Sequence, residues 1–131
     1  MFTILVCGGR DYTDFEKIHN ALADLCDRKG LWDRPSSAAK RWVGKNALCV
    51  VTGGARGADT IAIEWALLNG AAFKVYEAEW DKYGLRAGPV RNQAMLQENK
   101  IDLVLAARGG AGTADMVRRA KKAGIEVKII K

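Results

Sequence analysis

The sequence predicts an α/β/α protein of Rossmann type, in which a doubly wound, mostly parallel sheet of five strands lies between two layers of helices. Short apolar runs alternate with longer helical segments along all 131 residues. These runs are nearly continuous in Val, Ile and Leu, as is typical of strands covered on both faces. Three of them end at a glycine pair with an arginine nearby: Gly8-Gly9-Arg10, Gly53-Gly54-Ala55-Arg56 and Arg108-Gly109-Gly110.

Each element is expected from a local pattern. We expect strands at 2–7, 47–51, 73–76, 102–107 and 126–130, and helices at 14–29, 58–69, 90–98 and 113–123. The first helix is predicted from apolar residues at helical spacing, namely Phe15, Ile18, Leu22 and Leu25, behind a cap at Thr13 or Asp14. Gly70 and Gly124 are expected to end the second helix and the last helix.

The length favours a single domain over residues 1–131, with two connections longer than the fold requires. Residues 31–46 are expected to form a surface insertion at the edge opposite the glycine loops, either mobile or an oligomer contact. Residues 77–89 follow the third strand and so lie at the glycine edge. There Trp80 is expected either to stack on a bound base or to pack under its loop.

Composition limits the classes of protein. The three cysteines (Cys7, Cys26 and Cys49) have no disulfide-like or metal-like spacing, so we expect core thiols, no metal and a reducing, cytoplasmic setting. No apolar run approaches the roughly 20 residues of a membrane span, and none resembles a signal peptide, so no membrane is expected.

The net charge of +6 invites a nucleic-acid interpretation. Most of the excess lies between Arg118 and Lys131, which hold six basic residues and one acidic residue. A basic helix face is more often solvated surface than a binding site, and no aromatic residues alternate with these charges. A DNA-associated module that uses this basic C-terminal face is therefore an alternative that we do not favour.

The glycine loops indicate the ligand class. In a parallel sheet these loops meet at one edge, where ligands bind. Glycines let backbone N–H groups approach a phosphate, helix N-termini favour anions, and arginine grips phosphate bidentately. No P-loop motif is present, and the nearest approaches to G-x-G-x-x-G are imperfect, so ATPase, GTPase and hydride-transfer functions are disfavoured. The prediction is a nucleotide or another phosphate ester.

The ordered motifs resemble a known family. The set comprises Cys7-Gly8-Gly9-Arg10-Asp11-Tyr12, Thr52 to Asp59 with Trp65-Ala66, Trp80, the stretch from Ala87 to Met95, and Gly109 to Met116. Together these motifs resemble the YspA/YpsA-related branch of the SLOG superfamily, which includes the LOG phosphoribohydrolases and the Rossmann domain of DNA-processing protein A. The resemblance implies a Rossmann-like sheet that binds a nucleotide or an NAD-derived, ADP-ribose-like molecule. Relatives often pair, which implies a homodimer.

Two departures from the LOG pattern bear on catalysis. LOG hydrolases carry an Arg-Lys pair and a P-G-G-x-G-T-x-x-E loop whose glutamate acts at the ribose. Here Arg91 matches, but Asn92 replaces the lysine and Met116 stands at the glutamate position. A glycosidic bond needs a carboxylate for cleavage. Because the expected glutamate is missing, Asp115, Asp59 or Asp11 would have to supply this carboxylate. Binding without turnover is therefore favoured over hydrolysis.

The candidate site residues fall into groups by expected role. Ligand or phosphate binding is expected from Gly8, Gly9, Arg10, Gly53, Gly54, Arg56, Gly57, Asp59, Arg91, Asn92, Gly109, Gly110, Gly112 and Thr113. Base stacking is expected from Trp80 and Tyr12. Asp115 and Arg91 are the catalytic candidates if the protein is an enzyme. Ion pairs of Arg56 and Arg91 with Asp59 or Glu64 are the alternative to phosphate binding, and Thr113 is expected to cap its helix.

Three functions therefore remain open. The favoured one is a nucleotide sensor or carrier that requires no cofactor and has a nucleotide ligand. The second is a nucleoside 5'-monophosphate phosphoribohydrolase, and the third is the DNA-associated module.

Overall fold

A computed structural model describes residues 1–33, 41–43 and 47–130 of the chain. Its strands are β1 (Phe2–Cys7), β2 (Trp32–Asp33), β3 (Arg41–Trp42), β4 (Leu48–Thr52), β5 (Ala72–Val75), β6 (Leu103–Ala107) and β7 (Glu126–Ile130). Its α-helices are α1 (Phe15–Arg28), α2 (Ala58–Asn69), α3 (Trp80–Tyr83), α4 (Ala87–Glu98) and α5 (Ala111–Lys122). A 3₁₀ turn, Gly84–Arg86, joins α3 to α4.

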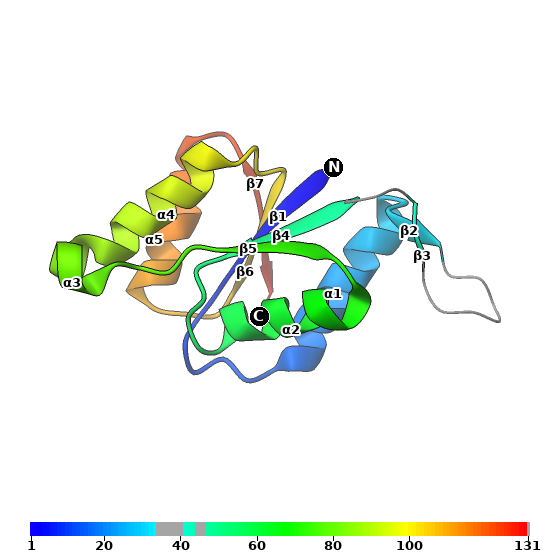
Figure 1. The fold of residues 1–131 in the computed structure, drawn as a ribbon, viewed down its shortest axis with the longest axis horizontal. Helices are drawn as coiled ribbons and strands as arrows, with labels where there is room; N and C mark the ends of the chain where they lie inside the picture. The colour runs from blue at the N-terminus through cyan, green and yellow to red at the C-terminus, as the bar shows by residue number, and fades with distance from the viewer. Residues whose placement is uncertain (34–40, 44–46, 131) are drawn as a thin grey trace.

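The main sheet has the order β5-β4-β1-β6-β7, and every neighbouring pair is parallel. Figure 1 shows α1 and α2 on one face of this sheet and α4 and α5 on the other. The predicted Rossmann-like fold is therefore confirmed, with all five strands of the main sheet parallel. The order places β1 in the middle, so the loops after β1, β4 and β6 leave the sheet side by side.

The core has two layers, one on each face of the sheet. Ile18, Leu22 and Leu25 of α1 are buried in one core layer with residues of α2, β1 and β4, as their helical spacing predicts. Phe15 is a correction to that prediction, because it is 55% exposed and contacts the ring of His19 edge-on. It is the first residue of α1, so it lies beyond the sheet layer that covers the later turns. Asp14 caps this helix by accepting a hydrogen bond from Lys17 N–H.

The helix boundaries after β5 and β6 differ from the expected ones. Helix α4 begins at Ala87, three residues earlier than expected, with Pro89 in its first turn, where a missing N–H is tolerated. Helix α5 begins at Ala111 with Gly110 as N-cap. Thr113 is thus the third helical residue, and its expected capping role was wrong, because the helix starts two residues before it.

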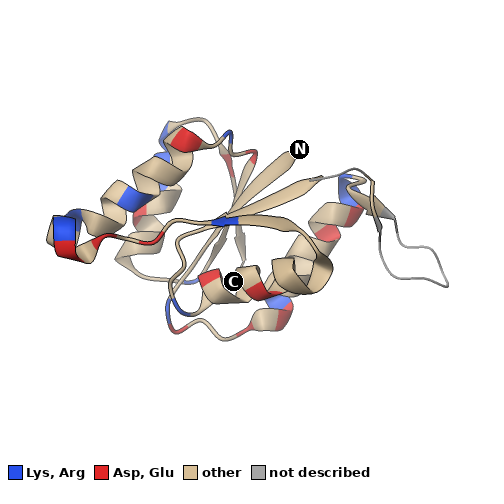
Figure 2. Cartoon of the chain, in the orientation of Figure 1, with Lys and Arg blue, Asp and Glu red and all other residues tan. Residues whose placement is uncertain are grey.

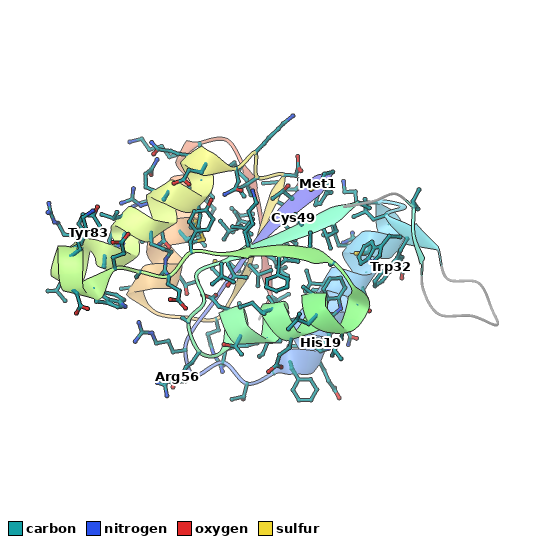
Figure 3. All side chains as sticks on the ribbon, viewed as in Figure 1. Met1, His19, Trp32, Cys49, Arg56 and Tyr83 are labelled. Atoms are coloured by element: carbon teal, nitrogen blue, oxygen red, sulfur yellow. The ribbon has the colours of Figure 1, made fainter. Side chains whose placement is uncertain are left out.

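The described ends of the 31–46 insertion pack into the core instead of lying on the surface. Trp32 is buried, and its ring contacts those of Trp42 and Trp65. Strands β2 and β3 pair Trp32 with Trp42 in an antiparallel ladder beside α1, where Figure 3 labels Trp32. The expected surface excursion is corrected at these ends, because large apolar rings are more stable inside the α1–α2 layer. Residues 34–40 and 44–46 lie outside the described residues.

Trp42 offers a test of this packing. Its indole N–H donates a 2.7 Å hydrogen bond to the Asn69 carbonyl at the end of α2. Trp42→Phe should lower the free energy of unfolding by about 1 kcal/mol, since it removes this bond and little apolar surface. Urea unfolding followed by circular dichroism measures the change. Trp80→Phe, at an exposed ring without such a bond, should leave the stability unchanged, and an equal loss in both variants would contradict the assignment.

None of the helices in the described part of the chain is long and apolar enough to span a membrane.

Candidate nucleotide site

A cavity of about 560 Å³ opens at the carboxyl ends of β1, β4 and β6, and we call it the main cavity. Many of the predicted site residues line it: Gly8, Gly9, Arg10, Gly53, Asp59, Trp80, Arg91, Asn92, Gly110, Gly112, Thr113 and Asp115. An adjoining cleft of about 260 Å³, which we call the arginine cleft, adds Gly54 and Arg56. The loops that the sequence placed together therefore do meet.

The structure keeps three predicted residues out of both the main cavity and the arginine cleft. Tyr12 is buried in the α1–α2 core layer, so its predicted role in base stacking was wrong. Its N–H binds the Gly9 carbonyl, and this turn directs the ring inward. Gly109 lines a different groove beside β7, and Gly57 lines neither the main cavity nor the arginine cleft.

The glycines divide into two classes. A Cβ on Gly8 would lie 2.8 Å from Ala107 Cβ, and a Cβ on Gly53 would overlap the Arg91 guanidinium. Gly8 is therefore needed for packing of the protein itself, whereas at Gly53 the flexible end of the Arg91 side chain would have to shift. In contrast, a Cβ on Gly110 or Gly112 would meet no atom within 4 Å, and neither residue has a positive φ. The fold does not require glycine at these two positions, which border the main cavity.

The N-terminus of α5 faces this cavity through Gly110, Ala111, Gly112 and Thr113. Among the described residues no acceptor is found for the N–H groups of Ala111, Gly112 and Thr113. Exposed N–H groups at a helix N-terminus, together with the helix dipole, favour an anion. The predicted phosphate role of Gly110, Gly112 and Thr113 is consistent with this geometry and remains a prediction.

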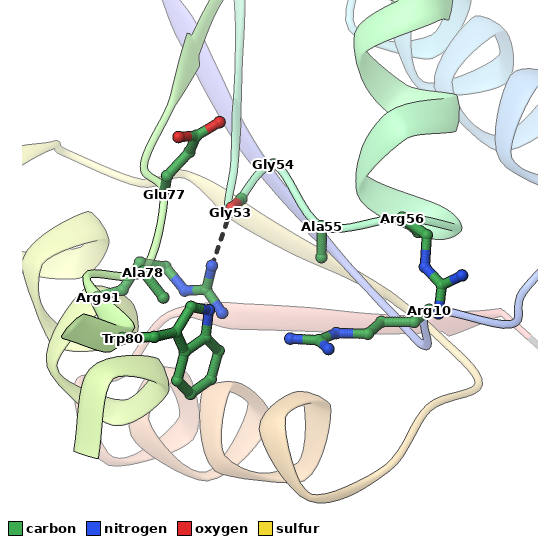
Figure 4. Close-up of a pocket in the computed structure, with 9 residues that line it drawn as sticks. All are labelled: Arg10, Gly53, Gly54, Ala55, Arg56, Glu77, Ala78, Trp80 and Arg91. Atoms are coloured by element: carbon green, nitrogen blue, oxygen red, sulfur yellow. Dashed lines mark hydrogen bonds between the residues drawn. The ribbon is translucent and has the colours of Figure 1, made fainter. Parts of the chain in front are cut away.

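Three arginines surround the two depressions (Figure 4). Arg91 is half-buried on α4 and donates to the carbonyls of Gly53 (2.9 Å) and Tyr76 (3.3 Å). Arg10 and Arg56 are exposed on the loops after β1 and β4. None of the three forms an ion pair with a carboxylate among the described residues, so the alternative pairing with Asp59 or Glu64 is not seen. The linings of the two depressions also contain the carboxyl groups of Asp59, Asp115 and Glu77, so groups of both signs occur together at this edge.

Asp59 is a buried carboxyl group in the same cavity. Its Oδ2 accepts a 3.2 Å hydrogen bond from Ala55 N–H. Burial raises the pKa of Asp59 to about 6, although the Ala55 hydrogen bond and the charge of Arg91 oppose the rise. This carboxyl group can therefore exchange a proton near neutral pH, as groups in binding and catalytic sites often do.

Asp115 has a different environment. Its oxygens accept from Arg118 (2.6 Å), Arg119 (2.8 Å) and Asn92 (3.0 Å). Burial opposes ionisation, but the hydrogen bonds from Arg119 and Asn92 and the two arginine charges outweigh it, so the pKa of Asp115 lies below its usual value. A carboxylate held in this way is a poor proton donor. Asp115 thus acts as a structural anchor between α4 and α5.

Asn92 connects this anchor to the site. Its side chain donates to the Gly112 carbonyl and to Asp115, and its Oδ1 accepts from Arg91. The chain of hydrogen bonds runs from Gly53 through Arg91 and Asn92 to Asp115 and Arg119. Sequence reasoning missed this network, because its members come from different elements and only their positions in the fold bring them together.

The basic C-terminal face is partly neutralised by the same network. Arg118 and Arg119 pair with Asp115, and Arg119 also donates to Gln93. In Figure 2 acidic and basic positions both occur on α1, whereas α2 carries acidic positions only. The DNA-associated alternative therefore gains no support from this geometry.

The fold and the cavity define a Rossmann-like α/β protein with a cavity at the carboxyl edge of its sheet, lined by arginines, carboxyl groups and a helix N-terminus. The model of the family described as "YspA, cpYpsA-related SLOG family" matches residues 2–83, and the chain belongs to this family. The chain is also similar to the Gene 61 protein of Mycobacterium phage D29. The two are 35% identical over 134 residues, which cover 97% of this chain and 94% of the relative.

Proposed function

We propose that this protein binds a nucleotide or an ADP-ribose-like derivative in the main cavity, as a ligand sensor or carrier. The observation that carries the proposal is the convergence of Arg10, Arg91 and the free N–H groups of α5 on one cavity. Its volume of about 560 Å³ falls within the range of small-molecule sites. Membership of the SLOG family supports a nucleotide-related ligand.

The arrangement suggests a role for each group. The N-terminus of α5 and Arg91 would take the phosphate. Among the described residues the helix offers N–H groups without an acceptor, and Arg91 offers a guanidinium that forms no ion pair. Asp59 would accept from the ribose hydroxyl groups, and the half-exposed ring of Trp80 would stack on the base. No metal or cofactor is required for binding of this kind.

Two observations favour binding without hydrolysis. Met116 occupies the position of the LOG glutamate and is fully buried in the core layer between α5 and the sheet. Asp115, the substitute acid suggested by the sequence, is held as a carboxylate by two arginines. A phosphoribohydrolase remains the second candidate, because Asp59 lies in the main cavity with a pKa raised to about 6 by burial.

Thermal unfolding with a panel of ligands tests the proposal. The panel contains the nucleoside monophosphates, ADP-ribose, NAD and cyclic dinucleotides. A ligand at about 100 times its Kd should raise the Tm clearly, because binding stabilises only the folded state. Chromatography of the same mixtures separates the two candidates: a sensor leaves the ligand intact, whereas a hydrolase releases free base and ribose 5-phosphate. The absence of any shift would refute nucleotide binding.

Gly112→Ala assigns the effect to the N-terminus of α5. The variant should be as stable as the wild type or slightly more stable, because alanine favours a helix and meets no atom within 4 Å. Its methyl group borders the main cavity, so ligand affinity should fall about tenfold. Ala114→Ser adds one heavy atom to the same helix outside this cavity and should bind normally. Equal affinity of Gly112→Ala and wild type would place the ligand elsewhere.

A further inference from the structure

Arg10 lines the main cavity and lies against Trp80. The Arg10 Cζ atom is 5.7 Å from the centroid of the Trp80 ring, within the range of a cation–π contact. Figure 4 shows the guanidinium extending from the loop after β1 toward the indole on α3. Both residues line the main cavity and the arginine cleft. The ring that would stack on a base is thus partly occupied by a side chain of the protein itself.

The position of Arg10 follows from what surrounds it. Among the described residues no carboxylate forms an ion pair with its guanidinium. Arg91 lines the same cavity: burial lowers the pKa of Arg91, the charge of Asp59 raises it, and the charge of Arg10 lowers it by repulsion. The Trp80 ring, 46% exposed, is the partner that Arg10 contacts. This contact is weak at an exposed site, so a stronger anionic partner would displace it.

We infer that Arg10 makes the site selective for phosphorylated nucleosides over unphosphorylated ones, by covering Trp80 until a phosphate withdraws it. An uncharged nucleoside would have to displace Arg10 from the ring and would offer the guanidinium no anionic partner in return. A nucleotide would offer a phosphate that bridges Arg10 and Arg91, which removes their mutual repulsion and frees the ring for the base. The inference rests on the proposed nucleotide function and adds how the site rejects bases and nucleosides.

Arg10→Met tests this inference, because it removes the charge and keeps a long side chain. Dissociation constants are measured by calorimetry for the pairs AMP and adenosine, GMP and guanosine, CMP and cytidine, and UMP and uridine. The variant should bind the nucleoside of the preferred pair about two- to fivefold more tightly, the range expected for a lost cation–π contact. It should bind the nucleotide about tenfold to 100-fold more weakly, since a charged hydrogen-bond partner is lost.

Two further variants separate selectivity from a general change of charge or structure. Lys121→Met removes an exposed charge that lines neither the main cavity nor the arginine cleft, and it should leave nucleoside affinity unchanged. In a Trp80→Leu background, Arg10→Met should no longer tighten nucleoside binding, because the covered ring is gone. A structural role of Arg10 would lower both affinities together.

The outcomes distinguish the inference from the proposed function. If neither nucleotides nor nucleosides bind the wild type or the variants, both are wrong. If the wild type binds a nucleotide but Arg10→Met does not tighten nucleoside binding, the inference alone is wrong. Weaker nucleoside binding in Arg10→Met would also overturn it, since Arg10 would then hold the base rather than exclude it.

Discussion

Replacement of Gly57 by alanine should lower the free energy of unfolding by about 3 kcal/mol or more. Gly57 precedes α2 with φ +79° and ψ −127°, a conformation that residues with a Cβ rarely adopt. A Cβ there would overlap the Gly9 carbonyl oxygen and lie 2.7 Å from the Arg10 carbonyl carbon. The Gly9 carbonyl oxygen accepts hydrogen bonds from the N–H groups of Tyr12 and Ala58, so the loop after β1 cannot move away without breaking them. Urea unfolding followed by circular dichroism measures the loss.

Gly84 supplies the matched control. Its φ of +58° and ψ of −132° resemble those of Gly57, but a Cβ on Gly84 would meet no atom within 4 Å. Gly84→Ala should therefore cost backbone strain alone, about 1 to 2 kcal/mol. The difference between the two variants isolates the overlap between the loops after β1 and β4. Equal losses would show that the overlap is relieved by small shifts and that the loops are not locked together.

This contrast explains why the glycine pattern in the sequence predicted the position of the three loops but not the role of each glycine. The sequence predicted that three glycine loops share one edge, because strand ends in a parallel sheet do. It could not separate glycines that the fold needs, such as Gly8 and Gly57, from those that border open space, such as Gly110 and Gly112. That distinction depends on which atoms approach from other loops, and a linear motif does not contain this information.

The same reasoning applies to individual side chains. The apolar runs identified every strand of the main sheet. For β1, β4 and β6 the reason is burial on both faces, which demands continuous apolar residues. Tyr12 was misplaced because a turn at Gly9 directs it into the core, and Trp32 because its partners Trp42 and Trp65 are distant in the sequence. Contacts between distant elements decide such positions, whereas local patterns decide secondary structure.

The second large effect concerns Asp59. Asp59→Asn should raise the free energy of unfolding at pH 7.5 by about 1 to 3 kcal/mol, because a raised pKa means that ionised Asp59 destabilises the folded state. The pKa is about 6 in the folded protein against an ordinary value of 3.8. Folding therefore favours the protonated form of Asp59. The contribution of this group to the free energy of unfolding is fully present below pH 3.8 and is lost as the pH rises through about 6.

Urea unfolding of wild type and Asp59→Asn between pH 4 and pH 7.5 measures this effect. The stability advantage of the variant should be largest at pH 7.5 and should shrink toward pH 4. Asp115→Asn is the control of opposite sign: its pKa is lowered, so ionised Asp115 stabilises the fold, and its amide variant should be less stable at pH 7.5. An advantage of Asp59→Asn that does not vary with pH would mean that Asp59 is not the titrating group.

The ligand affinity of Asp59→Asn shows whether the charge of Asp59 serves ligand binding. If Asp59 accepts from the ribose hydroxyl groups, Asp59→Asn should bind the nucleotide about tenfold more weakly while unfolding at a higher temperature. A variant that gains stability and loses binding marks a residue kept for function, because the fold would be more stable without its charge. Replacement of a residue that only packs in the core would lower the free energy of unfolding of the protein. Unchanged affinity would leave the charge of Asp59 without a role in ligand binding and would exclude it from the proposed contact with ribose.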